Sequence, residues 1–120
     1  MRTYRIAENS EDYDLCRDEM EAEILAFPTI IAEENNMVIG FISSFGKKSN
    51  YSIGAVKANS AFVLLRMFHL YETILKNIGV PYYLIHIDRN NKTAIKMLNS
   101  FGITNKYDKT DKYLWYIKEI

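Results

Sequence analysis

The amino-acid sequence predicts an α+β domain built on one mixed, mostly antiparallel sheet with flanking helices. Apolar positions recur at every second residue in some stretches and at every third or fourth in others, so strands and helices alternate along the chain. Three strand-like stretches between residues 29 and 57 follow one another through short turns, which is typical of an antiparallel meander. A long helix then leads to the apolar stretch 81–87, as in a crossover between parallel strands.

Length and composition limit the classes of protein to which this chain can belong. Its 120 residues give room for one domain, which we place at 1–120. Fifteen basic and fifteen acidic side chains leave no net charge, so the composition does not favour a nucleic-acid partner or an anionic membrane. A single cysteine, Cys16, excludes an internal disulfide and fits a reducing compartment, and no apolar stretch is long enough to span a bilayer. We therefore expect a cytoplasmic protein with no nucleic-acid or membrane partner.

The chain is expected to begin with a strand and a helix. Residues 2–7 alternate polar and apolar side chains, which indicates a strand. Asn9 or Ser10 can then cap a helix that has acidic residues in its first turn and continues to about residue 25. Pro28 prevents this helix from continuing.

The next three elements are predicted to be antiparallel strands. Residues 29–34 and 37–45 are apolar and rich in β-branched side chains, and they flank Asn35-Asn36. Asparagine tolerates the positive φ that a tight hairpin turn requires. After a polar turn, residues 51–57 form a third strand, in which Gly54 weakens strand pairing unless something packs closely against it.

A helix over residues 60–78 and a strand over 81–87 are predicted next. Gly79 is suited to a C-terminal helix cap, and Pro81 prevents the helix from continuing. Strand 81–87 is almost continuously apolar, as expected for a strand covered on both faces. The helix is also expected to be largely buried, because its polar side chains form only a narrow stripe of Arg66, His69, Thr73 and Lys76.

The C-terminal part is predicted to be a short helix and two strands. Asn90 or Asn91 can cap the helix, and Gly102 ends it. Strands are expected at 103–107 and 113–117, around a turn at 108–111. The helix face that packs against the sheet would consist of Ala94, Met97, Leu98 and Phe101.

The spacing of residues in this last helix resembles a known family. Asn91 is followed by Ala94 three residues later, by Leu98 seven residues later, and by Gly102 and Ile103 eleven and twelve residues later. This layout resembles the C-terminal half of the GNAT superfamily of N-acetyltransferases, including small GNAT-like proteins encoded by phages. The similarity covers nearly the whole chain, because residues 38–42 resemble the family's third strand and the helix from Ser60 takes the place of its cofactor-binding helix.

The resemblance implies a way of binding acetyl-CoA. In that family the fourth and fifth strands separate, and backbone groups along the gap pair with the pantetheine arm of the cofactor. Amides at the start of the following helix bind its pyrophosphate. The residues that this implies for cofactor binding are Ala55, Val56, Ser60 and Asn91, with Ile85, His86 and Ile87 on the other side of the gap.

The sequence departs from the family pattern where chemistry is performed. The family's phosphate loop has glycines at alternating positions because residues without Cβ let several amides converge on an anion, but segment 58–66 contains none. Phe62 and Leu64 stand near the expected glycines and would crowd a pyrophosphate, which leaves Arg66 as the only nearby positive charge. Leu98 stands where many members have a tyrosine that protonates the departing thiolate, and strand 51–57 lacks an acid that could serve as a base.

His86 is the candidate catalytic residue, since an imidazole on the edge of the gap could take a proton near neutral pH. Its alternative role is that of a hydrogen-bonded strand residue, as helix capping is for Asn91. We expect no metal site, because the two histidines lie far apart in sequence and lack a set of partners. The other polar candidates have simpler roles: His69 as a solvated residue, Cys16 as a core residue, and Glu33 or Glu34 at the acceptor cleft or on the surface.

Two functions follow from these observations. One is an acetyl-CoA-dependent N-acetyltransferase of weak or lost activity that acts on an unidentified amine. The other is a non-catalytic GNAT-fold protein that binds or assembles with a protein partner, for example in a phage virion or in host takeover, and it needs no acetyl-CoA. A virion component would be associated with the particle rather than only cytoplasmic, and homo-oligomerisation stays open in both cases.

Overall fold

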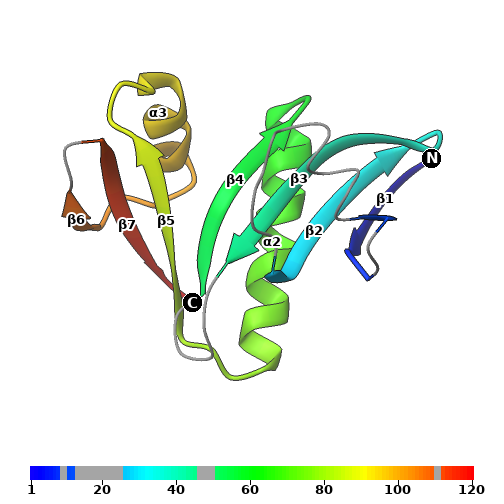
Figure 1. Ribbon diagram of the computed structural model, residues 1–120, viewed down its shortest axis with the longest axis horizontal. Helices are drawn as coiled ribbons and strands as arrows, with labels where there is room; N and C mark the ends of the chain where they lie inside the picture. Colours follow the sequence, from blue (N-terminus) through cyan, green and yellow to red (C-terminus); the bar gives the residue numbers. More distant parts are fainter. Residues whose placement is uncertain (9–10, 13–25, 46–50, 110–111) are drawn as a thin grey trace.

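The structure, a computed structural model, consists of one seven-stranded sheet with helices packed against it (Figure 1). It describes residues 1–8, 11–12, 26–45, 51–109 and 112–120, and for residues 26–28, 44–45, 54–55 and 107–109 it describes the backbone alone. The elements are β1 (Arg2–Ile6), β2 (Ala26–Glu34), β3 (Met37–Phe45), β4 (Ser52–Ala58), α2 (Ala61–Asn77), β5 (Tyr82–Asp88), α3 (Lys92–Ser100), β6 (Lys106–Lys109) and β7 (Tyr113–Glu119).

The order of the described strands is β1-β2-β3-β4-β5-β7-β6, and among them only the β4–β5 pair is parallel. This confirms the predicted α+β class with a mixed, mostly antiparallel sheet. The predicted helix between residues 9 and 25 lies almost entirely outside the described residues, although Glu11 and Asp12 are helical. The turn predicted at 46–50 also lies outside them.

The predicted hairpin between β2 and β3 is confirmed. Asn35 and Asn36 have φ angles of 54° and 67°, and the ladder on either side of them closes at Glu34 and Met37. A two-residue turn with positive φ at both positions matches the right-handed twist of the flanking strands. The asparagines are there because they adopt this conformation at little cost.

The start of β2 differs from the prediction. Pro28 was expected to separate a helix from a strand, but β2 begins at Ala26 and includes the proline. The pairing with β3 is irregular here, because the register shifts between Ala26 and Ile30. Proline is tolerated at such a bulge, where the ladder does not need its missing amide.

The ends of α2 are set by local sequence, as predicted. The Ser60 hydroxyl accepts a hydrogen bond from the Val63 amide at 3.2 Å. At the other end Gly79, at φ 83°, donates to the Lys76 carbonyl, and the Val80 amide donates to the Leu75 carbonyl. This pair of bonds is a Schellman motif, which needs a residue that accepts positive φ.

A smaller part of the α2 surface is buried than the sequence predicted. One face packs on the sheet, whereas Phe62 and Leu65 are 59% and 50% exposed. The prediction of a largely buried helix was therefore wrong, because the sheet covers only one side of α2. The buried face consists of Val63, Leu64, Met67, Phe68, Tyr71 and Leu75.

Both described helices lie on the same face of the sheet. Phe68 of α2 and Phe101 at the end of α3 contact each other with ring centroids 5.9 Å apart. The two helices share one apolar core with Ile30 and Ile42 from the centre of the sheet and Tyr116 from β7. Burial of these side chains is the main source of stability for such a domain.

The sixth strand begins later than predicted. The sequence placed a strand at 103–107, but β6 covers Lys106–Lys109, so two residues of the expected turn belong to the strand. Ile103 is instead part of the cap of α3, where its amide donates to the Leu98 carbonyl at 2.9 Å. Its side chain is buried beside Leu98, and an amide used in the cap cannot also pair in a strand ladder.

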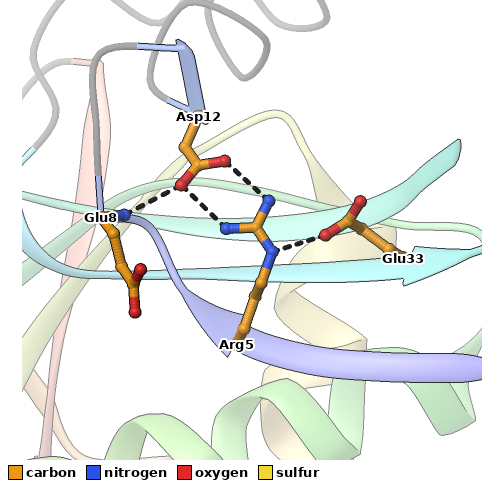
Figure 2. Close-up of polar contacts among 4 residues, drawn as sticks. All are labelled: Arg5, Glu8, Asp12 and Glu33. Atoms are coloured by element: carbon orange, nitrogen blue, oxygen red, sulfur yellow. Dashed lines mark hydrogen bonds and ion pairs between the residues drawn. The ribbon is translucent and has the colours of Figure 1, made fainter. Parts of the chain in front are cut away.

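Arg5 on β1 joins the sheet to Asp12 (Figure 2). Its Nη1 and Nη2 donate to the two oxygens of Asp12 at 2.8 and 2.6 Å, and its Nε donates to Glu33 at 2.5 Å. Asp12 is 8% exposed and also accepts from the Glu8 amide at 2.9 Å. The hydrogen bonds to Asp12 raise the pKa of the Arg5 guanidinium above its ordinary value.

Candidate functional site: the gap between strands β4 and β5

The candidate site begins where β4 and β5 separate. Their parallel pairing consists of Ser52 with Leu84 and Ile53 with Ile85, after which the strands diverge (Figure 1). Beyond that point residues 55–58 remain paired with β3, and residues 86–88 with β7. Each strand therefore keeps one ladder and turns its other edge to the gap, as the family resemblance implied.

A β-bulge at Gly54 coincides with the point of separation. Ser43 pairs with Ala55 and Ser44 with Ile53, so Gly54 is the extra residue on β4. A bulge bends its strand and increases the local twist. Because Gly54 directly follows the last residue of β4 that pairs with β5, the bulge accounts for the divergence of the two strands.

The gap contains a cavity of about 700 Å³. Ile85 belongs to the core beneath the helices, and side chains alternate faces along a strand, so His86 and Asp88 lie on the opposite face. Since residues from both faces line it, the cavity passes through the sheet from the helical side. Its walls are formed by Ile53, Val56, Lys57, Ala58 and Asn59 of β4 and the loop after it, Ser60, Ala61, Leu64 and Phe68 at α2, Ile85, His86, Ile87 and Asp88 of β5, Asn91, Ala94, Met97 and Leu98 at α3, and Tyr113 of β7.

The start of α2 forms one end of the cavity. Ser60 occupies the N-cap position, so the amides of Ala61 and Phe62 have no acceptor within the helix. Phe62 was expected to crowd a phosphate group, but its side chain is 59% exposed and does not line the cavity, whereas Leu64 is buried in its wall. The side chains predicted to obstruct the gap therefore leave it open.

The positive charge near this end differs from the prediction. Arg66 was expected to be the only nearby cation, yet its guanidinium lies 5.5 Å from the centroid of the Tyr4 ring on β1. Lys57, at the end of β4, lines the cavity instead. Lys57 could hardly be chosen from sequence, because a lysine near the end of a strand is usually an ordinary surface residue.

His86 is held between two aromatic rings on the face of the sheet opposite the helices. Its ring centroid lies 4.7 Å from that of Trp115, at an interplanar angle of 32°, and 4.9 Å from that of Tyr113, which meets it edge-on. Burial lowers the pKa of His86 from its ordinary value of 6.5. The imidazole is therefore neutral at pH 7 and can accept a proton.

The structure brings four of the five predicted site residues to the cavity. His86, Val56, Ser60 and Asn91 all line it. Asn91 also has its alternative role, because its Oδ1 caps α3 by accepting from the Ala94 amide at 3.1 Å. Ala55 lies on β4 opposite Ser43, and its side chain lies outside the described part of the chain.

Two further residues at the cavity were not singled out from sequence. Asp88 ends β5 and Tyr113 begins β7, and the two are directly paired across the sheet. Both line the cavity beside His86. The only sequence signal was that Asp88 lies two residues after His86 and so on the same face of its strand. Leu98, expected where the family has a tyrosine, is 4% exposed and lines the wall.

The remaining polar candidates lie elsewhere. Glu33 is bound by Arg5, and Glu34 pairs with Arg2 at 3.4 Å, so neither lines the cavity. His69 is exposed on α2, as predicted, and Cys16 lies outside the described residues. The described ranges contain no cluster of three or more His, Cys, Asp or Glu side chains that could hold a metal ion. Of the helices in the part of the chain that the structure describes, none is both long enough and apolar enough to cross a membrane.

Comparison with known proteins agrees with this geometry. Neither models of protein families nor curated protein sequences match the chain. Among solved structures it is similar to the ribosomal-protein-S18-alanine N-acetyltransferase from Escherichia coli, with a TM-score of 0.75 and 14% identity over 100% of this chain and 94% of that one. It is also similar to a GNAT-family acetyltransferase from Listeria monocytogenes, with a TM-score of 0.69 and 15% identity over 99% and 95% of the two chains.

A third similar structure is the PaiA N-acetyltransferase from Thermoplasma acidophilum in complex with coenzyme A. Its TM-score is 0.70 at 15% identity, over 92% of this chain and 69% of that one. At such identities the likeness concerns the fold, and the chain has the fold of the GNAT N-acetyltransferases.

Proposed function

We propose that this protein is an N-acetyltransferase that uses acetyl-CoA as its acyl donor and binds it between β4 and β5. The observation that carries this proposal is the early end of the β4–β5 ladder at Ile53 and Ile85, together with the cavity of about 700 Å³ that follows it. Cavities of roughly 300–1,000 Å³ are typical of small-molecule and cofactor sites. The coenzyme A complex of the similar PaiA structure supports the same choice of ligand.

The residues present fit a ligand with a linear amide-containing arm and a diphosphate. Beyond Ile53 and Ile85 the facing edges of β4 and β5 are not paired with each other, and their backbone groups are suited to such an arm, as in the binding of an added strand. The amides of Ala61 and Phe62 at the start of α2 are suited to a diphosphate. Lys57 adds a positive charge to the lining of the cavity. Backbone recognition of this kind does not require the glycines that segment 58–66 lacks, because Phe62 is exposed and does not line the cavity.

The opposite face of the sheet supplies the groups for acyl transfer. Acetyl-CoA, when bound, supplies an activated thioester carbonyl. Asp88 attracts the ammonium form of an amine acceptor to the cavity, and the neutral His86 imidazole accepts the proton that the amine must lose. Tyr113 and Trp115 hold the imidazole in place by contacting it on two sides. Leu98 has no proton to give, so the departing thiolate is protonated by solvent or by the Tyr113 hydroxyl.

The second candidate is a protein that binds a ligand or partner without catalysis, for example as a phage virion or host-takeover component. Leu98 favours it, because a buried apolar side chain lines the cavity where many members of the family place a proton donor. The two candidates share the fold and differ in turnover. Fold alone does not decide between them.

Calorimetric titration with acetyl-CoA, followed by an assay of thiol release with a panel of amines, separates the two functions. The proposal predicts saturable binding of acetyl-CoA and an acetylated product detected by mass spectrometry. His86→Gln should bind acetyl-CoA as tightly as the parent protein does but form the product more slowly. Binding without turnover by any amine supports the second candidate. Absence of binding at millimolar acetyl-CoA would exclude the cofactor site itself.

A further inference from the structure

A polar hollow adjoins the cavity at the end of β5. The described residues that line it are Asp88, Arg89, Asn90 and Lys112, around a volume of about 580 Å³. Asp88 lines both the hollow and the cavity, so the two spaces meet at this residue. The Arg89 amide donates to the Lys112 carbonyl at 2.9 Å, which ties the end of β5 to the start of β7. Asp88 Oδ1 accepts from the Asn90 amide at 2.9 Å and is thereby held at the border.

The hollow is directly connected to His86 through one aromatic ring. The Lys112 ammonium lies 5.2 Å from the centroid of the Tyr113 ring, and the same ring lies 4.9 Å from that of His86. The distance between the Lys112 ammonium and the centroid of the His86 ring is therefore no greater than the sum of these two distances. An extended peptide advances roughly 3.3–3.6 Å per residue, so this separation is bridged by no more than about three residues.

The charges are arranged in a definite order. A carboxylate, Asp88, stands at the cavity, where the acceptor amine must arrive, and two cations, Arg89 and Lys112, stand in the hollow beyond it. An acceptor with an amine at one end and an anionic group at the other would meet opposite charges at both ends. The whole chain has no net charge, so this order is a local feature rather than a consequence of composition.

We propose that the hollow is an acceptor subsite for an anionic group, and that the substrates of this protein are short amines that also carry a carboxylate or phosphate, such as a small amino acid or a di- or tripeptide. This rests on the proposed acetyl transfer at the neighbouring cavity and narrows its substrate class. Arg89 and Lys112 bind the anionic group, while Asp88 and His86 receive the amine. Two positive groups are needed because Asp88 at the border would otherwise repel an anion.

The test compares acceptors that differ only in the anionic group, at saturating acetyl-CoA. Suitable pairs are 4-aminobutyrate and butylamine, glycylglycine and glycylglycinamide, and phosphoethanolamine and ethanolamine. Thiol release and product mass give kcat/KM for each. We expect the anionic member of at least one pair to exceed its neutral partner by about tenfold or more, since loss of a charge-assisted hydrogen bond has an effect of this size.

Substitutions at the hollow test whether its residues cause the preference for anionic acceptors. Arg89→Gln and Lys112→Gln should each reduce the preference for the anionic acceptor about tenfold, by raising KM for the anionic acceptor more than KM for its neutral partner. Lys96→Gln is the matched control, because Lys96 is exposed on α3 and lines neither the cavity nor the hollow. In this control the preference should be unchanged.

Two results would overturn the subsite. The first is equal or better use of the neutral acceptors. The second is a rise in KM for acetyl-CoA, absent with 3′-dephospho-acetyl-CoA, on substitution of Arg89 or Lys112, which would assign the hollow to the cofactor's 3′-phosphate. Failure of acetyl-CoA to bind, or its binding without turnover of any amine, would instead refute the proposed function, so the two failures are distinguishable.

Discussion

Filling the cavity with a side chain should abolish stabilisation by acetyl-CoA. Ala94 lies on α3, is half-buried and lines the cavity, so Ala94→Phe places a phenyl ring in the space proposed for the cofactor. A ligand that binds only the folded state stabilises it by about 2.7 kcal/mol at a concentration of one hundred times its Kd. This is the stabilisation that the variant should lose.

The corresponding shift in melting temperature follows from the size of the chain. An entropy of unfolding of about 2.1 cal/mol/K per residue, applied to 120 residues, gives about 0.25 kcal/mol per degree. Acetyl-CoA should therefore raise the Tm of the parent protein by about 10 °C under these conditions. Ala94→Phe should show almost no rise at the same concentration.

The control for this experiment is Thr93→Phe. Thr93 precedes Ala94 on the same helix, is exposed and does not line the cavity. It adds a phenyl ring to the same turn, so its response to acetyl-CoA should equal that of the parent protein. Differential scanning fluorimetry with and without acetyl-CoA measures all three proteins. A full shift in Ala94→Phe, or an equal loss in both variants, would refute the placement of the cofactor.

Three further predictions concern His86, Leu98 and Asp12. Because burial lowers the pKa of His86, the acetylation rate should rise with pH through a midpoint below pH 6.5 and then level off. His86→Gln should be about 10²–10⁴-fold slower and lack this rise. The same rise in the variant would rule out His86 as the base. Protonation of His86 also favours the unfolded state, so the free energy of unfolding should fall as pH drops below 6.5 in the parent protein and less so in the variant. Leu98→Tyr should increase kcat by supplying a hydroxyl in the cavity wall, and an unchanged kcat in a folded variant would show that thiolate protonation is not limiting. Asp12→Asn removes the charge from the carboxylate that Arg5 binds with two hydrogen bonds. This substitution should lower the free energy of unfolding, measured by urea denaturation, by about 1–2 kcal/mol. Glu34→Gln, in the exposed pair with Arg2, should change the free energy of unfolding by less than about 1 kcal/mol.

Helix caps and the hairpin turn were predictable because each depends on a few neighbouring residues. Asn90 or Asn91 was expected at the start of α3 and Gly102 at its end. In the structure the side chain of Asn91 caps the helix, and Gly102 has φ 80°. Asn35 and Asn36 likewise adopt the positive φ that their positions require. These conformations are decided by the covalent chemistry of the residues themselves.

Exposure and strand boundaries were less predictable. Phe62 and Leu65 continue the apolar pattern of α2, yet they are exposed because the sheet covers only one side of the helix. Ile103 has a β-branched side chain of the kind common in strands, but its amide donates to the Leu98 carbonyl in the cap of α3. Both outcomes depend on which partner lies nearby, and a periodic pattern does not contain that information.

The residues of the site also divide into those that were predictable from sequence and those that only the structure revealed. The sequence was sufficient to choose four of the residues that line the cavity, because the resemblance to the GNAT family indicated which positions face the gap. These residues are Val56, Ser60, His86 and Asn91. Asp88 and Tyr113 were missed, since only the pairing of β5 with β7 brings them beside His86.

By itself, the sequence determined the order of strands and helices, the turns and caps that join them, and the likeness to an acetyltransferase fold. These depend on local conformational preferences and on the spacing of residues along one chain. Only the tertiary structure decided that the gap between β4 and β5 is open, that Phe62 is exposed and does not line it, and that Lys57 rather than Arg66 lines it. A cavity is formed by residues that are distant in sequence, so its shape is settled when the strands pair and the helices pack.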